Sequence, residues 1–184
     1  MFIETEQTPN PATLKFLPGR SVMAQGTADF TSAEAAERSP LAQRLFQVEG
    51  VSGVFLGSDF VTVTKTDPKT WQILKPAILG IIMEHFAANR PVILDSTAAP
   101  VTADAAEDSE IVTQIKELLD TRVRPAVAQD GGDIIFQGYE DGVVFLHLQG
   151  SCSGCPSSTA TLKMGIENML KHYVPEVVEV RAVA

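Results

Sequence analysis

Apolar residues alternate with polar ones in short runs along both halves of the chain, and stretches of helical spacing separate these runs. In the first half this pattern predicts strands at 1–6, 12–17, 22–25 and 91–94, a helix at 40–47, and a hairpin of 51–56 with 60–65. A long helix is expected from residue 67 to about residue 89, because Asp67 suits an N-cap and Pro68 the first helical position. Pro76 should kink this helix or delay its start.

The second half shows a helix, two strands, a second helix and a strand, in that order. The helical spacing of Ile111, Ile115 and Leu118 predicts a first helix from residue 109 to about residue 122, which Pro125 should stop. The later predicted elements are strands at 133–137 and 143–148 across a turn at 138–142, a helix at 156–173 and a strand at 177–183. The buried stripe expected on the later helix comprises Leu162, Ile166, Met169, Leu170 and Tyr173.

A segment without either periodicity separates the two halves. Residues 95–108 contain five alanines, four carboxylates and a proline, a composition that predicts a flexible linker. The sequence therefore predicts an α+β protein with an N-terminal domain at 1–94 and a C-terminal domain at 109–184. Each is expected to be a small α/β-sandwich-like unit, and the C-terminal one has the order α-β-β-α-β.

The charge balance excludes two classes of partner. The chain has 14 Lys and Arg against 23 Asp and Glu, and its net charge of −9 argues against binding nucleic acid or an anionic membrane. No apolar stretch reaches the roughly 18 residues of a transmembrane helix. Two cysteines cannot form the disulfide framework of a small secreted domain, so a reducing compartment is expected.

The two cysteines, Cys152 and Cys155, lie where a predicted strand leads into a predicted helix. Pro156 suits the first helical position, which would make Cys155 the N-cap residue. The partial positive charge of a helix N-terminus favours a thiolate, so both sulfurs should be good ligands or nucleophiles. The surrounding Ser, Gly and Pro residues predict an exposed loop. Cys152 and Cys155 are therefore the candidate site.

The charges around this loop point to an anionic ligand. Between Asp141 and Glu167 there is no carboxylate, and Lys163 is the single base, although the last 84 residues sum to −7. Iron–sulfur clusters held by thiolates are anionic and are usually bound by four cysteines. One chain offers two, so two chains on a two-fold axis would complete the site. A site shared in this way suits a carrier better than an enzyme.

Three alternatives use the same cysteines. A thioredoxin-like dithiol oxidoreductase would need two further strands and a helix, and 29 residues follow Cys155. A zinc site with His172 would require a ligand about 24 Å along the helix. Purely structural cysteines would be buried and inert. Nearby, 130–133 reads as a glycine turn into a strand rather than a ligand loop, and Arg122 and Arg124 read as ordinary helix-end cations.

The C-terminal half resembles the NifU-type C-terminal domain of the Nfu iron–sulfur proteins. The matching residues are Arg124-Pro125, Asp130-Gly131-Gly132-Asp133, the run from Leu148 to Ser158 that contains both cysteines, and Thr161-Leu162. The opening residues 8–16, Thr-Pro-Asn-Pro-Ala-Thr-Leu-Lys-Phe, resemble the N-terminal domain that accompanies it.

The resemblance implies a carrier or scaffold that binds a labile [4Fe-4S] cluster between two subunits, with Cys152 and Cys155 as ligands. It implies a homodimer when the cluster is bound, with upstream cluster donors and client apo-proteins as partners. A [2Fe-2S] cluster fits two cysteines per chain equally well, and the resemblance alone selects four irons. The N-terminal domain, which lacks ligands, is expected to dock clients or donors. A cytoplasmic bacterial protein is expected, with a mature mitochondrial form as the alternative.

Overall fold

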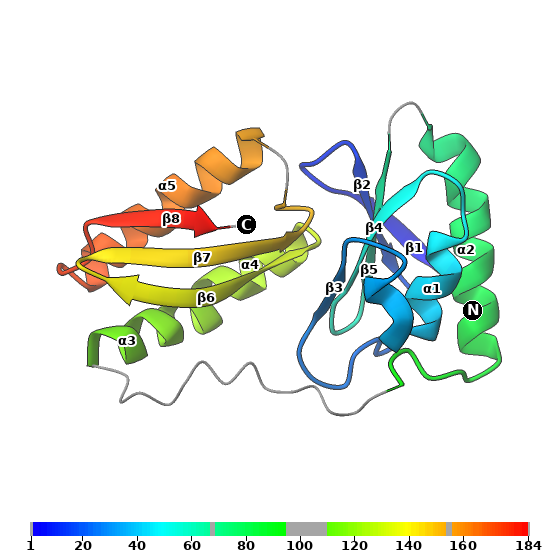
Figure 1. Cartoon of the computed structure of the whole chain (residues 1–184), viewed down its shortest axis with the longest axis horizontal. Helices are drawn as coiled ribbons and strands as arrows, with labels where there is room; N and C mark the ends of the chain where they lie inside the picture. The colour runs from blue at the N-terminus through cyan, green and yellow to red at the C-terminus, as the bar shows by residue number, and fades with distance from the viewer. Residues whose placement is uncertain (1, 67–68, 95–109, 154–155, 184) are drawn as a thin grey trace. The chain divides into compact units, whose positions relative to one another are not determined.

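The computed structural model describes residues 2–66, 69–94, 110–153 and 156–183. The chain forms two compact units, Met1–Ala98 and Ala99–Ala184 (Figure 1). Each unit has its own hydrophobic core. The predicted linker at 95–108 lies outside the described residues. Helices and sheets occur in both units, so the predicted α+β class is confirmed. No helix in the described part of the chain is long and apolar enough to cross a membrane.

The N-terminal unit is an antiparallel five-stranded sheet covered on one face by helices (Figure 1). The strands follow the order β1-β2-β5-β4-β3: β1 Glu4–Gln7, β2 Thr13–Leu17, β5 Val61–Lys65, β4 Val51–Leu56 and β3 Ala28–Phe30. The helices are the 3-10 turn Ala35–Arg38, α1 Pro40–Phe46 and α2 Trp71–Ala87. Large side chains from both layers form the core, among them Phe16, Phe30, Leu41, Leu56, Ile78 and Ile82.

Two predicted strands of this unit are wrong. The third strand lies at Ala28–Phe30 rather than 22–25, because the Val22 and Met23 N–H groups both donate to the Ser58 carbonyl instead of a strand ladder. Residues 91–94 form no strand; the Leu94 N–H donates to Arg38 O, which ties the segment to a helical turn.

The long helix α2 begins later than predicted. Its N-cap residue is Thr70, and the predicted cap at Asp67 and Pro68 lies outside the described residues. Pro76 lies inside α2 and neither ends it nor delays its start beyond Trp71. Pro76 and Gln72 are both exposed, so solvent can bond the Gln72 carbonyl that the missing proline N–H leaves free.

The C-terminal unit is a three-stranded sheet in the order β6-β7-β8. Its elements are α3 Glu110–Leu118, a π-helical turn Leu119–Val123, α4 Arg124–Gln129, β6 Gly132–Glu140, β7 Val143–Gly150, α5 Pro156–Tyr173 and β8 Glu179–Val183. Strands β6 and β7 pair antiparallel, whereas β7 and β8 pair parallel, so α5 serves as the crossover between them. The predicted α-β-β-α-β order is therefore confirmed, as are both ends of α5.

Pro125 does not stop the first helix of this unit, contrary to expectation. The helix passes through the π-helical turn and continues as α4, where Pro125 occupies the first turn. The Arg124 N–H bonds the Leu119 carbonyl five positions back, so the helix ladder is already displaced where Pro125 supplies no N–H. The helix predicted to end at about residue 122 is thus followed directly by α4.

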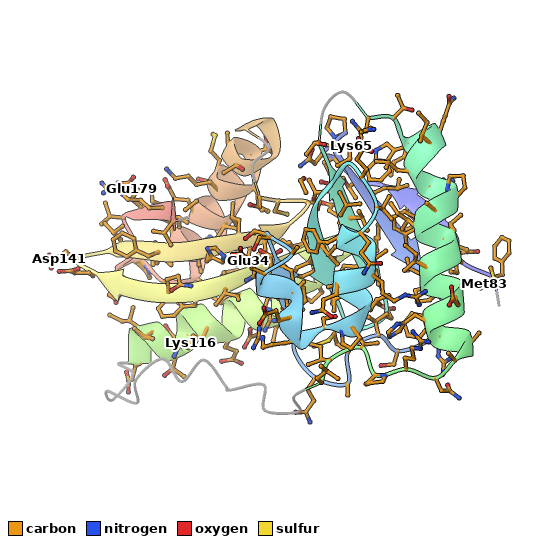
Figure 2. The ribbon with its side chains drawn as sticks, turned by 45° about the vertical axis from the view of Figure 1, so that its right-hand side comes forward. Glu34, Lys65, Met83, Lys116, Asp141 and Glu179 are labelled. Atoms are coloured by element: carbon orange, nitrogen blue, oxygen red, sulfur yellow. The ribbon has the colours of Figure 1, made fainter. Side chains whose placement is uncertain are left out.

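The hairpin of this unit also turns later than predicted. Its tip is Asp141-Gly142, both with positive φ (49° and 81°), which is the geometry of a tight two-residue hairpin turn (Figure 2). Gly138, expected in the turn, lies instead beside a register shift within β6. Tyr173, expected to be buried on α5, is 46% exposed and lies with its ring 5.0 Å from the Arg122 guanidinium.

Candidate functional site

Cys152 lies just beyond the end of β7, where Gly150 adopts a positive φ of 64° and turns the chain toward α5. The residue is 5% exposed and belongs to the hydrophobic core of the C-terminal unit. The expectation of an exposed loop is therefore wrong for Cys152. Cys155, the other predicted ligand, lies outside the described residues.

Gly132 makes room for the Cys152 sulfur. The first residue of β6, Gly132, pairs with Gly150 at the end of β7, which places it beside the cysteine loop. A Cβ atom on Gly132 would lie 2.8 Å from Cys152 Sγ and 2.7 Å from the Gln149 carbonyl oxygen. Any side chain at this position would therefore displace the sulfur or the strand.

Hydrogen bonds tie the cysteine loop to its neighbours on both sides. The Ser151 hydroxyl donates to the Asp130 carbonyl, and the Ser151 N–H donates to the Gly131 carbonyl at 3.2 Å. On the other side, Thr159 Oγ1 in α5 donates to the Cys152 carbonyl at 3.2 Å. Residues 130–133 thus act as the predicted structural turn, and they also hold the loop that carries the candidate ligand.

An ion pair between the partly exposed Arg124 and the buried Asp133 supports this turn. Arg124 donates from Nε and Nη2 to the two carboxylate oxygens of Asp133, each at 2.9 Å, and the Asp133 side chain is 5% exposed. Asp133 Oδ1 also accepts the Ile134 N–H at 2.8 Å. The hydrogen bonds to Asp133 are the main reason that the pKa of Arg124 is raised, and Asp120 adds to the effect.

Sequence reasoning missed this pair. Arg124 was interpreted as an ordinary cation at a helix end, but it begins α4 and binds a carboxylate nine positions further along the chain. No periodicity connects the two residues, because the π-helical turn and the glycine turn between them set the geometry. The one available signal was Asp133 itself, a carboxylate at the start of a predicted strand.

The histidines of this unit do not join the cysteine. His147 lies within β7 opposite Ile135, and the ring of His172 packs edge-on against Tyr173 with centroids 5.0 Å apart. Among the described residues, no three His, Cys, Asp or Glu side chains gather in an arrangement that could hold a metal ion. The described part of one chain thus contributes one sheltered sulfur to the candidate site.

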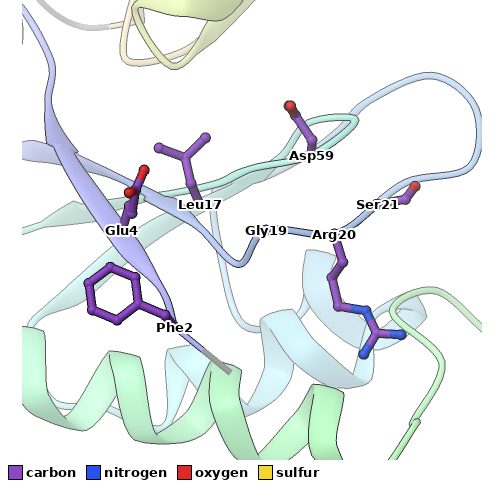
Figure 3. A pocket seen from close by; sticks show the side chains of 7 residues that line it. All are labelled: Phe2, Glu4, Leu17, Gly19, Arg20, Ser21 and Asp59. Atoms are coloured by element: carbon purple, nitrogen blue, oxygen red, sulfur yellow. The ribbon is translucent and has the colours of Figure 1, made fainter.

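A shallow hollow on the N-terminal unit is a weaker candidate (Figure 3). It is lined by Phe2, Glu4, Leu17, Gly19, Arg20, Ser21 and Asp59. The cation of this set, Arg20, donates to the Phe86 carbonyl at 3.4 Å and lies over the Phe86 ring. The hollow combines mixed charges with no thiol, so it offers no ligand set for a cluster.

Comparison with known proteins assigns both units. Residues 3–89 match the family model described as the N-terminal domain of the scaffold protein Nfu/NifU, and residues 115–181 match the NifU-like domain. The two α+β units, with a Cys-X-X-Cys loop leading into α5, therefore have the two-domain arrangement of iron–sulfur scaffold proteins. The chain belongs to the Nfu/NifU family.

Two curated relatives show how close this similarity is. The human "NFU1 iron-sulfur cluster scaffold homolog, mitochondrial" is 54% identical over 178 residues, which cover 96% of this chain and 70% of that protein. The "NifU-like protein 5, mitochondrial" of Arabidopsis thaliana is 56% identical over 181 residues, covering 96% and 66%. This chain thus spans about two thirds of the relatives' length. A solution structure of a NifU-like protein from Saccharomyces cerevisiae aligns at a TM-score of 0.46 and 29% identity, covering 50% of this chain and 84% of that one.

The relatives correct one expectation. A cytoplasmic bacterial protein was predicted, but the similar curated proteins from Arabidopsis thaliana, Drosophila ananassae and Homo sapiens are all named as mitochondrial. Composition and charge of folded domains do not encode a compartment, because targeting is read from separate segments.

Proposed function

We propose that this chain is an iron–sulfur cluster carrier or scaffold rather than an enzyme. It binds a labile [4Fe-4S] cluster between two copies of the chain and delivers it to client apo-proteins, with the thiolates of Cys152 and Cys155 as ligands. The observation that carries the proposal is that both units match one scaffold family while the single Cys-X-X-Cys of the chain leads into α5.

Ligand counting supports a shared cluster. Four cysteines normally hold a cluster of either common type, and each chain has two. A two-fold axis through the cluster would bring the same loop from both chains together. A [2Fe-2S] cluster would need the same four sulfurs, so iron content is the quantity that separates the two cluster types.

The position of Cys152 supports a labile cargo. The residue contributes to an apolar core and its loop is held by hydrogen bonds from Ser151 and Thr159. In this proposal, binding iron draws the sulfur out of this position, and releasing iron lets it return. The stability of the closed loop therefore opposes retention of the cluster, which favours transfer over permanent storage.

For the N-terminal unit we propose a docking role for clients or donors. Its helix α2 has apolar residues on the outer as well as the inner face; Ile73 is 68% exposed and Met83 also faces outward (Figure 2). A helix with apolar residues on all sides is normally buried against other protein surfaces, so the outer face of α2 is suited to contact a partner. Deleting residues 1–94 should leave cluster binding intact and slow transfer to acceptors; unchanged transfer to every acceptor would remove this role.

Anaerobic reconstitution with iron and sulfide tests the cluster proposal. The expected product is a dimer with a visible charge-transfer band and about two irons per chain, whereas a [2Fe-2S] cluster would give about one. Cys152→Ala and Cys155→Ala should each abolish the band, and His172→Ala should retain it. Iron-free wild-type protein, or full binding by Cys152→Ala, would contradict the proposal; reduction of insulin disulfides would instead support a dithiol oxidoreductase.

A further inference from the structure

The outer face of α5 carries no charge along its middle turns. Five residues of this face are exposed: Ala160, Thr161, Met164, Gly165 and Asn168. Met164 is the large apolar side chain among them and is 66% exposed. A Cβ on Gly165 would meet nothing within 4 Å, so another surface can approach the helix backbone there. We refer to these five residues as the neutral face.

Along these middle turns the charged residues are Lys163 and Glu167, which lie beside the neutral face and are paired; Lys171 continues the face one turn further on and is bound to Glu167. Lys163 Nζ lies 3.8 Å from Glu179 of β8, and Glu167 accepts bonds from Lys171 Nζ at 2.7 Å and from the Val180 N–H at 3.2 Å. These contacts direct both side chains toward β8. They also lower the pKa of Glu167, chiefly through the Lys171 hydrogen bond, so its carboxylate stays charged and bound.

This neutrality is unusual for the region that contains it. The last 84 residues have 6 basic and 13 acidic side chains, so a surface taken at random would repel its own copy. On a two-fold axis each residue near the axis faces the same residue of the other chain, and identical charges would then lie together. A neutral face with an apolar residue at its centre avoids this cost.

We infer that the neutral face of α5 contacts the same face of a second copy of this chain when the cluster is bound. This inference rests on the proposed function, because both cysteine ligands immediately precede α5 and a shared cluster must bring the two helix starts together. The face spans about 12 Å along the helix, too short for the roughly 800 Å² per partner of a stable interface. The contact therefore orients the cluster-bound dimer and does not hold two empty chains together.

Met164→Asp tests the contact, with Val178→Asp as a matched control. Val178 is 64% exposed, follows α5 and packs on the hairpin tip at Gly142, outside the neutral face. After anaerobic reconstitution, iron transfer to a chelator and dimer mass are measured. Met164→Asp should lose iron at least about tenfold faster than wild type, since two carboxylates would face each other, and Val178→Asp should match wild type.

Mixing two charge variants separates a direct contact from a folding defect. Differently tagged Met164→Asp and Met164→Lys chains are reconstituted together, and native mass spectrometry counts the pairs. Opposite charges across the axis should raise mixed dimers well above the about half expected from random pairing. Random pairing, or wild-type behaviour of Met164→Asp, would overturn the inference alone. Wild-type protein that stays monomeric and iron-free would overturn the proposed function and the inference together.

Discussion

Gly132 and Cys152 are so close that a single methyl group on the glycine would lie 2.8 Å from the cysteine sulfur. The Gln149 carbonyl and the Cys152 N–H lie on the same side, at 2.7 and 3.2 Å from the added carbon. Two of these three neighbours are backbone atoms, so relief requires the end of β7 and the cysteine loop to shift together with the sulfur. The glycine turn at 130–133 therefore determines how deeply the candidate ligand is buried.

Gly132→Ala should loosen the cysteine loop and lower the free energy of unfolding of the C-terminal unit by about 1–3 kcal/mol. In a Cys155→Ser background, Cys152 should also react faster with a thiol reagent than in the parent. Gly138→Ala in the same strand is the control, because a Cβ there meets nothing within 4 Å. Equal labelling rates for the two glycine variants would show that Gly132 does not control exposure of the sulfur.

Arg124→Ala should destabilise the C-terminal unit by about 2–3 kcal/mol, because the buried Asp133 carboxylate would lose its partner. Arg124→Lys should recover part of the loss, since it restores the charge but not the bidentate hydrogen bonds to Asp133. The exposed pair of Arg181 with Glu179 provides the comparison, and Arg181→Ala should cost much less than Arg124→Ala because solvent screens this pair. Urea unfolding measures all three; similar costs for Arg124→Ala and Arg181→Ala would contradict this prediction.

His85 should make the N-terminal unit sensitive to acid. Burial lowers its pKa below the ordinary 6.5, the cations Arg44 and Arg90 lower it further, and Nε2 donates to the Pro91 carbonyl at 3.1 Å. The unfolded chain binds a proton on this histidine at about pH 6.5 while the folded chain does not, so stability falls as pH drops below about 6.5 toward the folded pKa.

Unfolding midpoints at several pH values check this prediction for His85. In His85→Gln, which keeps an N–H for the Pro91 carbonyl but cannot titrate, the slope of stability against pH should decrease. The exposed His172 belongs to the other unit, and His172→Gln should leave the N-terminal slope unchanged. An identical slope in wild type and His85→Gln would rule out His85 as the source.

Ser39→Ala should cost the N-terminal unit about 2–3 kcal/mol. The buried Ser39 hydroxyl oxygen accepts the Ala42 N–H at 3.1 Å as the cap of α1, and the hydroxyl donates to the Val92 carbonyl at 2.6 Å. The substitution therefore removes a helix cap and the link to the segment after α2. Ser32→Ala removes an exposed bond to the Ala35 N–H and should cost about 0.5 kcal/mol. Thermal unfolding distinguishes them, and equal midpoints would be the contrary result.

Local sequence patterns predicted most elements of this fold. They failed where contacts between residues far apart in the sequence determine the position of an element. The hairpin of β4 with β5 and the span of α5 follow from alternation, spacing and a well-placed proline, all of which are local. The strand β3 was misplaced because its position depends on a pairing with β4 more than twenty residues away. Pro125 was expected to stop the helix, but a π-helical turn precedes it and changes the helix hydrogen-bonding pattern there. No residue preference predicts such a turn.

The sequence was enough to select the candidate site, but it did not predict the environment of Cys152. The spacing of Cys152 and Cys155 and the absence of nearby carboxylates are properties of the sequence, and both led to the thiol site. The burial of Cys152 depends on Gly132, which is twenty positions earlier and meets the loop only because β6 and β7 pair in one particular register. The position of Asp133 beside Arg124 depends instead on the π-helical turn before Arg124 and on the glycine turn between the two residues.

If Cys152 is a cluster ligand, as we propose, its sheltered sulfur sets a kinetic limit on loading. If the loop must open before a donor can reach the sulfur, the loading rate rises with donor concentration and then levels off at the opening rate of the loop. Oxidants and alkylating reagents also reach the sulfur only while the loop is open. The sulfur of an empty chain is therefore protected in proportion to the time that its loop spends closed. The loading limit is then the opening rate, whereas protection follows the closed fraction, so a loop that opens and closes faster would load sooner without losing protection.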